Sequence, residues 1–156
     1  MALEDFKAAR KVLDGVIAST HLIPSPAFSR ATGNHVYLKP ENMQITGAYK
    51  LRGAYFKIST LTDEEKARGL ITASAGNHAQ GVAYAAQKAG VEATIVMPTT
   101  TPLVKVNNTK DYGAKVVLSG ETFDDAAAEA QRLVEEKGYT YIPPFNDLTV
   151  ATGQGT

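Results

Sequence analysis

One lysine stands out as a residue that could do chemistry. Lys50 lies in the stretch TGAYKLRGAY, residues 46–55, between Gly47 and Gly53. The two glycines indicate a loop, and a loop lysine can be a solvated charge, a clamp for a phosphate, or an amine that bonds covalently to a carbonyl. The stretch alone leaves these three interpretations open.

A second stretch has the composition of an anion site. Residues 72–81 read TASAGNHAQG and include the end of an apolar run typical of a strand. In open parallel sheets ligands bind at the carboxyl ends of the strands, and small residues let the free N–H groups of a following helix approach a carboxylate or phosphate. A plain strand-to-helix turn with Asn77 as its N-cap fits the same residues.

Spacing argues against several other kinds of site. GAYKLRG lacks the P-loop pattern, Gly153 and Gly155 stand at the chain end without a following helix, and no G-x-S-x-G elbow accompanies Ser74. The three histidines lack the spacing of metal ligands: His21, His35 and His78. We therefore predict a capping role for Ser74, a surface position for His78, and no metal site.

The elements that would position these residues follow a βα rhythm. Four runs rich in β-branched residues start about 22 to 24 residues apart, at 70–73, 93–97, 115–118 and 139–142. Three helices are expected between them: 77–89, one from Pro102 to Gly113, and one from Thr122 to Gly138. Strands in such a series are usually parallel, so residues 54–145 predict a small open α/β sheet with helices on its faces.

The residues before this unit do not follow the βα pattern. Residues 3–18 predict an amphipathic helix, a Pro-containing extended segment follows, and residues 35–38 predict a strand with little obvious sheet to join. Thr62 and Glu65 form a capping box for a short helix that would precede the first strand of the sheet.

Composition argues against further classes of function. The chain has 156 residues, of which 16 are basic and 16 acidic, so no charge excess indicates a nucleic-acid partner. It has no cysteine, hence no disulfide or thiolate metal site, which fits a cytoplasmic setting. No signal peptide is visible and no stretch approaches the ~20 apolar residues of a membrane span, so we expect no membrane partner.

Two long motifs in the right order resemble a known family. Residues 39–54, KPENMQITGAYKLRGA, and residues 74–81, SAGNHAQG, closely resemble the pyridoxal-phosphate-dependent serine/threonine dehydratases of the tryptophan synthase β-like fold, an α/β architecture. The resemblance extends to TGNHVYLK, IPPFND and the terminal GQGT. It implies a threonine dehydratase (threonine ammonia-lyase) activity that converts L-threonine to 2-oxobutanoate and ammonia, in a homo-oligomer that is a dimer or a tetramer.

The resemblance also implies roles for individual residues. Lys50 would bind the aldehyde of pyridoxal 5′-phosphate and remove the α-proton of the substrate, Tyr49 would pack against the cofactor ring, and Asn77 would hydrogen-bond the cofactor 3′-oxygen. The substrate carboxylate would be wrapped by Ser74, Ala75, Gly76, Asn77 and His78. This agrees with the anion site argued from the same loop.

Three departures from the family pattern affect this interpretation. Ala48 and Tyr49 stand where many relatives have Ser-Phe, so a hydroxyl near the cofactor is lost while the aromatic face is kept. Ala75 stands where related serine racemases tend to carry a second serine that acts on the opposite face of the substrate, and alanine cannot exchange a proton. Family chains also continue well beyond GQGT, with a glycine-rich phosphate cup and a residue that faces the pyridine nitrogen.

The chain therefore looks like an N-terminal fragment. Residues 1–53 would begin the large cofactor domain, 54–145 would form the small α/β domain, and 146–156 would return to the large domain. Alone it is expected to be inactive, because Lys50 would lack the phosphate anchor. The alternatives are an L-serine dehydratase, a serine racemase and a non-catalytic ligand-binding module. Threonine and serine differ by one methyl group, whose contacts in a pocket contribute only ~1–3 kcal/mol to the preference for one substrate.

Overall fold

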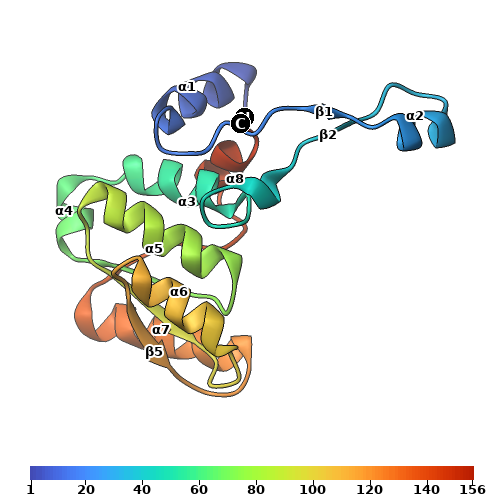
Figure 1. The fold of residues 1–156 in the computed structure, drawn as a ribbon. Helices are drawn as coiled ribbons and strands as arrows, with labels where there is room; N and C mark the ends of the chain where they lie inside the picture. The colour runs from blue at the N-terminus through green and yellow to red at the C-terminus, as the bar shows by residue number, and fades with distance from the viewer.

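The molecule is built on a parallel sheet, in a computed structural model that describes all 156 residues. Figure 1 shows the sheet with helices on both faces and an N-terminal segment that projects away from it. The strand order is β5-β4-β3-β6, and all the pairings are parallel. The strands are β3 (Leu70–Ala73), β4 (Ala93–Met97), β5 (Lys115–Leu118) and β6 (Thr140–Tyr141). The four predicted strands are confirmed, the last one shortened to two residues.

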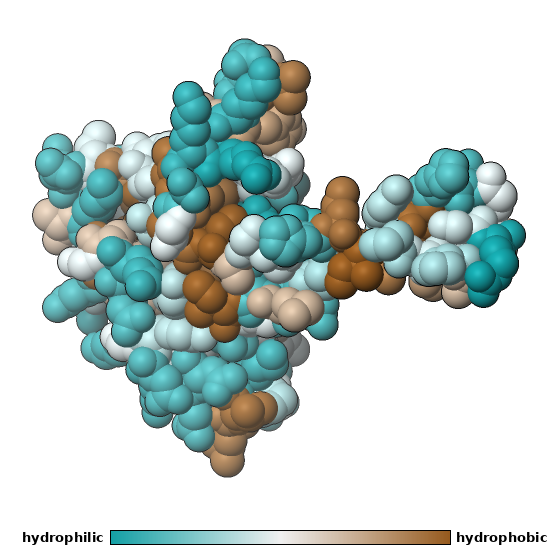
Figure 2. Space-filling view, turned by 45° about the horizontal axis from the view of Figure 1, so that its top comes forward, coloured by the Kyte–Doolittle hydropathy of each residue, from teal (hydrophilic) through white to brown (hydrophobic).

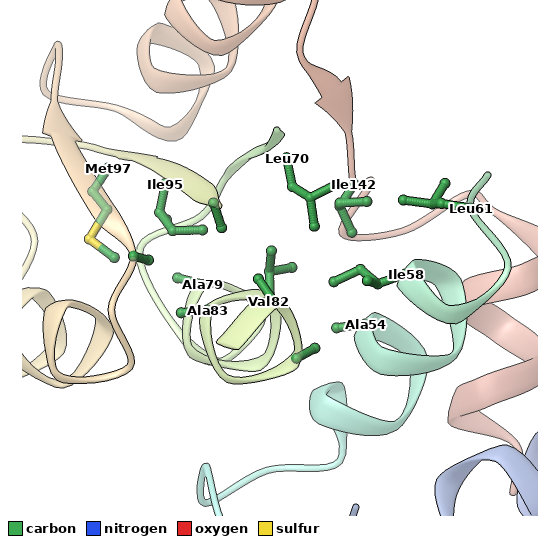
Figure 3. Close-up of a cluster of buried hydrophobic side chains, with 14 of the residues drawn as sticks. Ala54, Ile58, Leu61, Leu70, Ala79, Val82, Ala83, Ile95, Met97 and Ile142 are labelled. Atoms are coloured by element: carbon green, nitrogen blue, oxygen red, sulfur yellow. The ribbon is translucent and has the colours of Figure 1, made fainter. Parts of the chain in front are cut away.

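Helices cover both faces of the two central strands, and every residue of β3 and β4 is buried. On one face, α7 (Phe123–Lys137) packs small and apolar residues against Ile71 and Val96. On the other face, α5 (Asn77–Ala89), α6 (Leu103–Asp111) and α3 (Lys50–Ser59) enclose a larger core. Figure 3 shows part of this core, where Val82 and Ile58 point toward Leu70 and Ile142.

The ends of the predicted helices are set by local signals. Helix α5 has the predicted bounds and is followed by Gly90 in the left-handed region, at φ 67°. Helix α7 begins after Thr122, whose Oγ1 accepts a hydrogen bond from the backbone N–H of Asp125, and ends before Gly138 at φ 73°. The predicted capping box of Thr62 starts α4 (Asp63–Ala67).

Three helices were not expected from the sequence: α2 (Pro26–Thr32), in the segment predicted to be extended, α3 and α8 (Leu148–Gln154). Helices α3 and α8 cross closely because glycines face each other: a Cβ at Gly53 would lie 2.6 Å from the carbonyl oxygen of Val150, and one at Gly153 would lie 2.7 Å from that of Arg52. Gly53, one of the two glycines that predict a loop, is thus used for a helix crossing. The predicted domain boundary between residues 53 and 54 falls inside α3, and the division into domains stays a prediction.

The N-terminal region differs in part from the prediction. Helix α1 (Leu3–Leu13) is shorter than the predicted 3–18, because the backbone leaves the helix at Asp14 and reaches φ 72° at Gly15. Strand β1 (Ile23–Pro24) pairs antiparallel with β2 (Tyr37–Leu38), with α2 (Pro26–Thr32) between them and a 3₁₀ turn, η1 (Glu41–Met43), after them. The strand expected at 35–38 is therefore two residues long, and its partner is β1.

Residues 22–38, which we call the N-terminal arm, project from the body (Figure 1). Figure 2 shows hydrophobic surface where the arm leaves the body. Five large apolar side chains of the arm are exposed: Leu22, Ile23, Phe28, Tyr37 and Leu38. No helix of the structure combines the length and the apolar character that a membrane span requires.

Candidate functional site

Lys50 lies at the start of a helix, and the expectation that it stands in a loop is wrong. It is the first residue of α3, and its half-buried side chain crosses to a segment 94 residues away in sequence. There Nζ donates a 2.7 Å hydrogen bond to the backbone carbonyl of Pro144, which follows β6. Lys50 is therefore held at the carboxyl end of the sheet.

A glycine of α5 brings this helix close to the backbone of Lys50. A Cβ at Gly81 would lie 3.2 Å from the backbone nitrogen of Leu51 and 3.3 Å from the carbonyl oxygen of Lys50. These atoms belong to the main chain and cannot move aside as a flexible side chain would. Gly81 is the last residue of the motif SAGNHAQG, but the motif did not predict that this glycine sets the distance between α5 and the backbone of Lys50.

The loop between β3 and α5 is organised by Ser74. Its Oγ accepts hydrogen bonds from the backbone N–H groups of Gly76 and Ala79, both at 3.2 Å. The predicted capping role of Ser74 is confirmed. Asn77 is the first helical residue and Gly76 the N-cap, so the expectation of an Asn77 cap is wrong. A hydroxyl that caps from outside the helix leaves the Asn77 side chain free at the surface.

Three backbone donors of this loop have no hydrogen-bond partner within the chain. They are the N–H groups of Ala75, Asn77 and His78, at the beginning of a helix of 13 residues. The positive end of the helix dipole and three unpaired donors favour a carboxylate or a phosphate at this place. The geometry thus fits an anion site better than a closed turn.

His78 is buried, and the expectation of a surface histidine is wrong. Its side chain is 3% exposed, and Nε2 lies 3.2 Å from the carbonyl oxygen of Ile142. Burial, helped by the positive charge of Lys50, lowers the pKa of His78 to about 4. The ring is therefore neutral at neutral pH. Its other nitrogen, Nδ1, is buried without a hydrogen-bond partner.

The sequence-predicted site residues come from two elements that meet at one edge of the sheet. Residues 74–78 follow β3, and Lys50 starts α3, which packs against α5. Tyr49 directly precedes Lys50, its side chain is half exposed, and the centre of its ring lies 5.9 Å from Nζ of the lysine.

Arg52 and Glu41 form a second polar contact that the sequence did not single out. Nε and Nη2 of Arg52 donate to the two carboxylate oxygens of Glu41 at 2.8 and 2.9 Å. Hydrogen bonding to the guanidinium lowers the pKa of Glu41 to about 2. Thr20 donates to the same carboxylate, and Thr156 accepts from Arg52. This largely buried pair joins the first turn of α3 to η1 and to Thr156, two residues after α8.

Comparison with known proteins agrees with this architecture. Residues 13–156 match the family described as pyridoxal-phosphate dependent enzyme. The chain is 51% identical over its whole length to an L-threonine ammonia-lyase of Thermotoga maritima. Among solved structures, the processed threonine deaminase isoform 2 of Solanum lycopersicum superimposes with a TM-score of 0.89 at 46% identity over 99% of this chain. Maize serine racemase gives a TM-score of 0.91 at 33% identity over 98% of it.

This chain belongs to the family of pyridoxal-phosphate-dependent enzymes. The predicted family and its tryptophan synthase β-like α/β fold are confirmed. The chain spans 39% of the Thermotoga relative, 42% of the tomato chain and 46% of the maize chain, so it matches less than half the length of each.

Proposed function

We propose that this chain supplies the cofactor lysine and the carboxylate-binding loop of an enzyme that converts L-threonine to 2-oxobutanoate and ammonia. The observation that carries the proposal is the position of Lys50. Its amine lies at the carboxyl end of the sheet and bonds one main-chain carbonyl, while α5, which begins with unpaired N–H groups, passes directly against its backbone. The Thermotoga and tomato relatives, both named for threonine, support the choice of substrate.

The residues present fit pyridoxal 5′-phosphate and an amino acid. Lys50 offers an amine, Tyr49 offers an aromatic ring with an open face, and residues 75–78 offer three unpaired main-chain donors. These are the groups needed to hold an aldehyde, a pyridine ring and a carboxylate. No atom of the loop would have to give up a hydrogen bond to receive the anion.

Each residue has a defined task in this proposal. Lys50 holds the cofactor aldehyde, Tyr49 packs against the ring, and the exposed amide of Asn77 donates to the 3′-oxygen. Residues Ser74 to His78 surround the substrate carboxylate, which fixes one end of the substrate and restricts its rotation. When bound, the cofactor supplies an electron sink for the substrate α-carbon. Nζ of Lys50, once the substrate amine has displaced it from the aldehyde, would be free to accept the α-proton.

Serine racemisation is the second candidate, because the maize enzyme named for it has nearly the same fold. Ala75 favours elimination over racemisation, since a methyl group can neither donate nor accept a proton where related racemases tend to carry serine. Serine dehydration remains the nearest alternative to threonine dehydration. Only one methyl group of the substrate, worth ~1–3 kcal/mol, separates the two activities.

A labelling experiment tests the role of Lys50. The chain is mixed with substoichiometric pyridoxal phosphate, treated with borohydride, which fixes the aldehyde carbon on an amine, and mapped by mass spectrometry. We expect the label on Lys50, and none there in Lys50→Ala. Exposed Lys137, at the end of α7, is the internal control. Selective label on a lysine other than Lys50 would contradict the proposal, whereas label scattered over many lysines would mean that this chain alone does not hold Lys50 ready as the anchor.

The activity is tested in the whole protein. Lys50→Ala is expected to lower 2-oxobutanoate formation from L-threonine by about 10³-fold or more, because no other amine stands at this site. Faster formation of D-serine from L-serine than of ammonia would favour racemisation instead. We expect no turnover from the 156-residue chain alone, a prediction supported by its covering only 39% of the Thermotoga relative.

The setting of the enzyme is also a proposal. We infer a cytoplasmic homo-oligomer, a dimer or a tetramer, with a small amino acid as substrate and without nucleic acid or membrane partners. The balanced charge of the chain and its lack of cysteine support this inference. Light scattering of the whole protein and cell fractionation would test it.

A further inference from the structure

The three residues after β6 are held by contacts from three elements. The N–H of Ile142 donates to the carbonyl oxygen of Ile71 in β3, at 2.8 Å. The carbonyl oxygen of Ile142 lies 3.2 Å from Nε2 of His78 in α5, and that of Pro144 accepts from Lys50 in α3. The segment 142–144 thus connects His78 to the amine of Lys50.

This segment is stiff enough to transmit position. Its last two residues are prolines, whose rings fix φ near −65° and remove the backbone donors. Ile142 is fully buried, so its peptide cannot turn without disturbing the core. With φ fixed at both prolines, we expect a displacement of the Ile142 carbonyl to shift the Pro144 carbonyl, which is the one hydrogen-bond acceptor of Lys50 Nζ.

His78 makes only one hydrogen bond, and that bond faces this segment. Its pKa of about 4 keeps the ring neutral at neutral pH, and a neutral ring can donate to a carbonyl only if Nε2 carries the hydrogen. Nδ1 is then a buried acceptor without a partner, which costs free energy. An apolar side chain of similar size would avoid this cost, so the contact with Ile142 is what a histidine adds here.

We propose that His78 is a positioning residue for Lys50, acting through the carbonyl groups of the segment 142–144. His78 fixes the carbonyl of Ile142, the two prolines carry that position to Pro144, and the Pro144 carbonyl holds Nζ of Lys50 where the cofactor aldehyde would meet it. The inference rests on the proposed function for the role of Lys50, but not for the contacts themselves. His78 does not touch the reacting atoms in this scheme.

The test measures the accessibility of the Lys50 amine without any cofactor. Trace acetylation of the chain at pH 7, followed by mass spectrometry, gives the rate at Lys50 relative to exposed Lys137. We expect Lys50 to react more slowly than Lys137 in the unmodified chain. His78→Leu, which removes the donor, should raise the relative rate at Lys50 at least about threefold. His78→Gln, whose amide can still donate to Ile142, should stay within about twofold of the unmodified chain.

Tyr84→Phe is the matched control. Tyr84 lies further along α5 and its hydroxyl donates to the carbonyl oxygen of Val16, so the substitution removes a hydrogen bond of the same helix that does not involve the segment 142–144. We expect it to leave the relative rate unchanged at a temperature where circular dichroism shows every variant folded. An unchanged rate in His78→Leu, or an equal rise in Tyr84→Phe, would overturn the proposal. If His78→Leu does not fold, His78→Asn replaces it, because the shorter amide cannot reach Ile142.

A second measurement examines the ring itself. Nitrogen-15 NMR of the unmodified chain should show His78 as the neutral tautomer with hydrogen on Nε2, whereas hydrogen on Nδ1 would overturn the proposal. These outcomes are separable from the proposed function. Selective pyridoxal phosphate label on another lysine would reject Lys50 as the cofactor lysine, while the acetylation rates and the tautomer would still decide whether His78 positions its amine.

Discussion

The parallel sheet unit, residues 70–141, and the N-terminal arm, residues 22–38, differ in what holds them together. The sheet unit has two central strands with every residue buried, and each is covered by helices on both faces. The arm has two strands of two residues each, all four of them exposed, and a helix with no buried residue. Burial of apolar area is the main favourable term in folding, so the sheet unit carries far more of the stability per residue.

The difference explains where function lies in this chain. Lys50 stands between the two regions in the chain: α3 packs against α5 of the sheet unit, while Arg52, two residues further on, is bonded to Glu41 in η1, which follows the arm. A rigid unit on one side places the lysine. Lys50 itself is only half buried, which leaves part of its side chain exposed to a ligand.

The largest expected contrast comes from truncating an isoleucine in each region. Ile71→Ala, at a fully buried position in β3, should lower the free energy of unfolding by about 2–5 kcal/mol, because it removes buried methyl groups and leaves a cavity. Ile23→Ala, at a side chain 48% exposed in the arm, should lower it by less than about 1 kcal/mol. Urea unfolding followed by circular dichroism measures both. Equal losses would show that the arm contributes as much as the sheet.

A smaller contrast comes from adding one methyl group to a glycine. Gly153→Ala should cost about 1–3 kcal/mol, because the new Cβ would meet the backbone of Arg52 and Gly53 at 2.7 Å and force α3 and α8 apart. Gly33→Ala, in the arm, has nothing within 4 Å and is strained only by its φ of 68°, so we expect about 1 kcal/mol. Thermal unfolding compares the two. A larger loss for Gly33→Ala would contradict the close helix crossing.

The smallest effect is the pH dependence of the Arg52–Glu41 pair, which joins α3 to η1 just after the arm. Glu41 has a pKa of about 2 in the fold, against an ordinary value of 4.5. A carboxyl whose pKa is lowered by folding stabilises the fold above its unfolded pKa, and this stabilisation is lost as the pH falls toward the folded pKa. At pH 6 we expect the Arg52–Glu41 contact to contribute about 1 kcal/mol to the free energy of unfolding, after allowance for solvent screening. This contribution should disappear as the pH falls from 4.5 to 2.

Unfolding of Glu41→Gln against the unmodified chain measures this contribution. The difference in free energy of unfolding should be largest near pH 6 and should vanish toward pH 2. Glu129→Gln, which breaks a contact with Arg132 on the exposed surface of α7, is the matched control and should change stability little at any pH. A difference that does not depend on pH would mean that Glu41 acts through packing and not through its charge.

The sequence predicted the sheet unit closely because its signals are local. The strand runs, the capping hydroxyl of Thr122 and the glycines after α5 and α7 lie within or beside the elements that they define. The failures share the opposite property. Helix α3 was missed because Gly53, read as a loop residue, faces α8 about 100 residues later, and His78 was placed at the surface because its partner, Ile142, lies 64 residues away.

By itself, the sequence determined the βα rhythm, the family and the two motifs that contain Lys50 and the loop Ser74 to His78. Hydrophobic periodicity and helix caps act over a few residues, so they can be read before folding. Only the tertiary structure decided that Lys50 starts a helix, that Pro144 accepts its hydrogen bond, and that His78 is buried and neutral. These properties depend on burial and on contacts between distant segments, which exist only after α3, α5 and β6 have packed together.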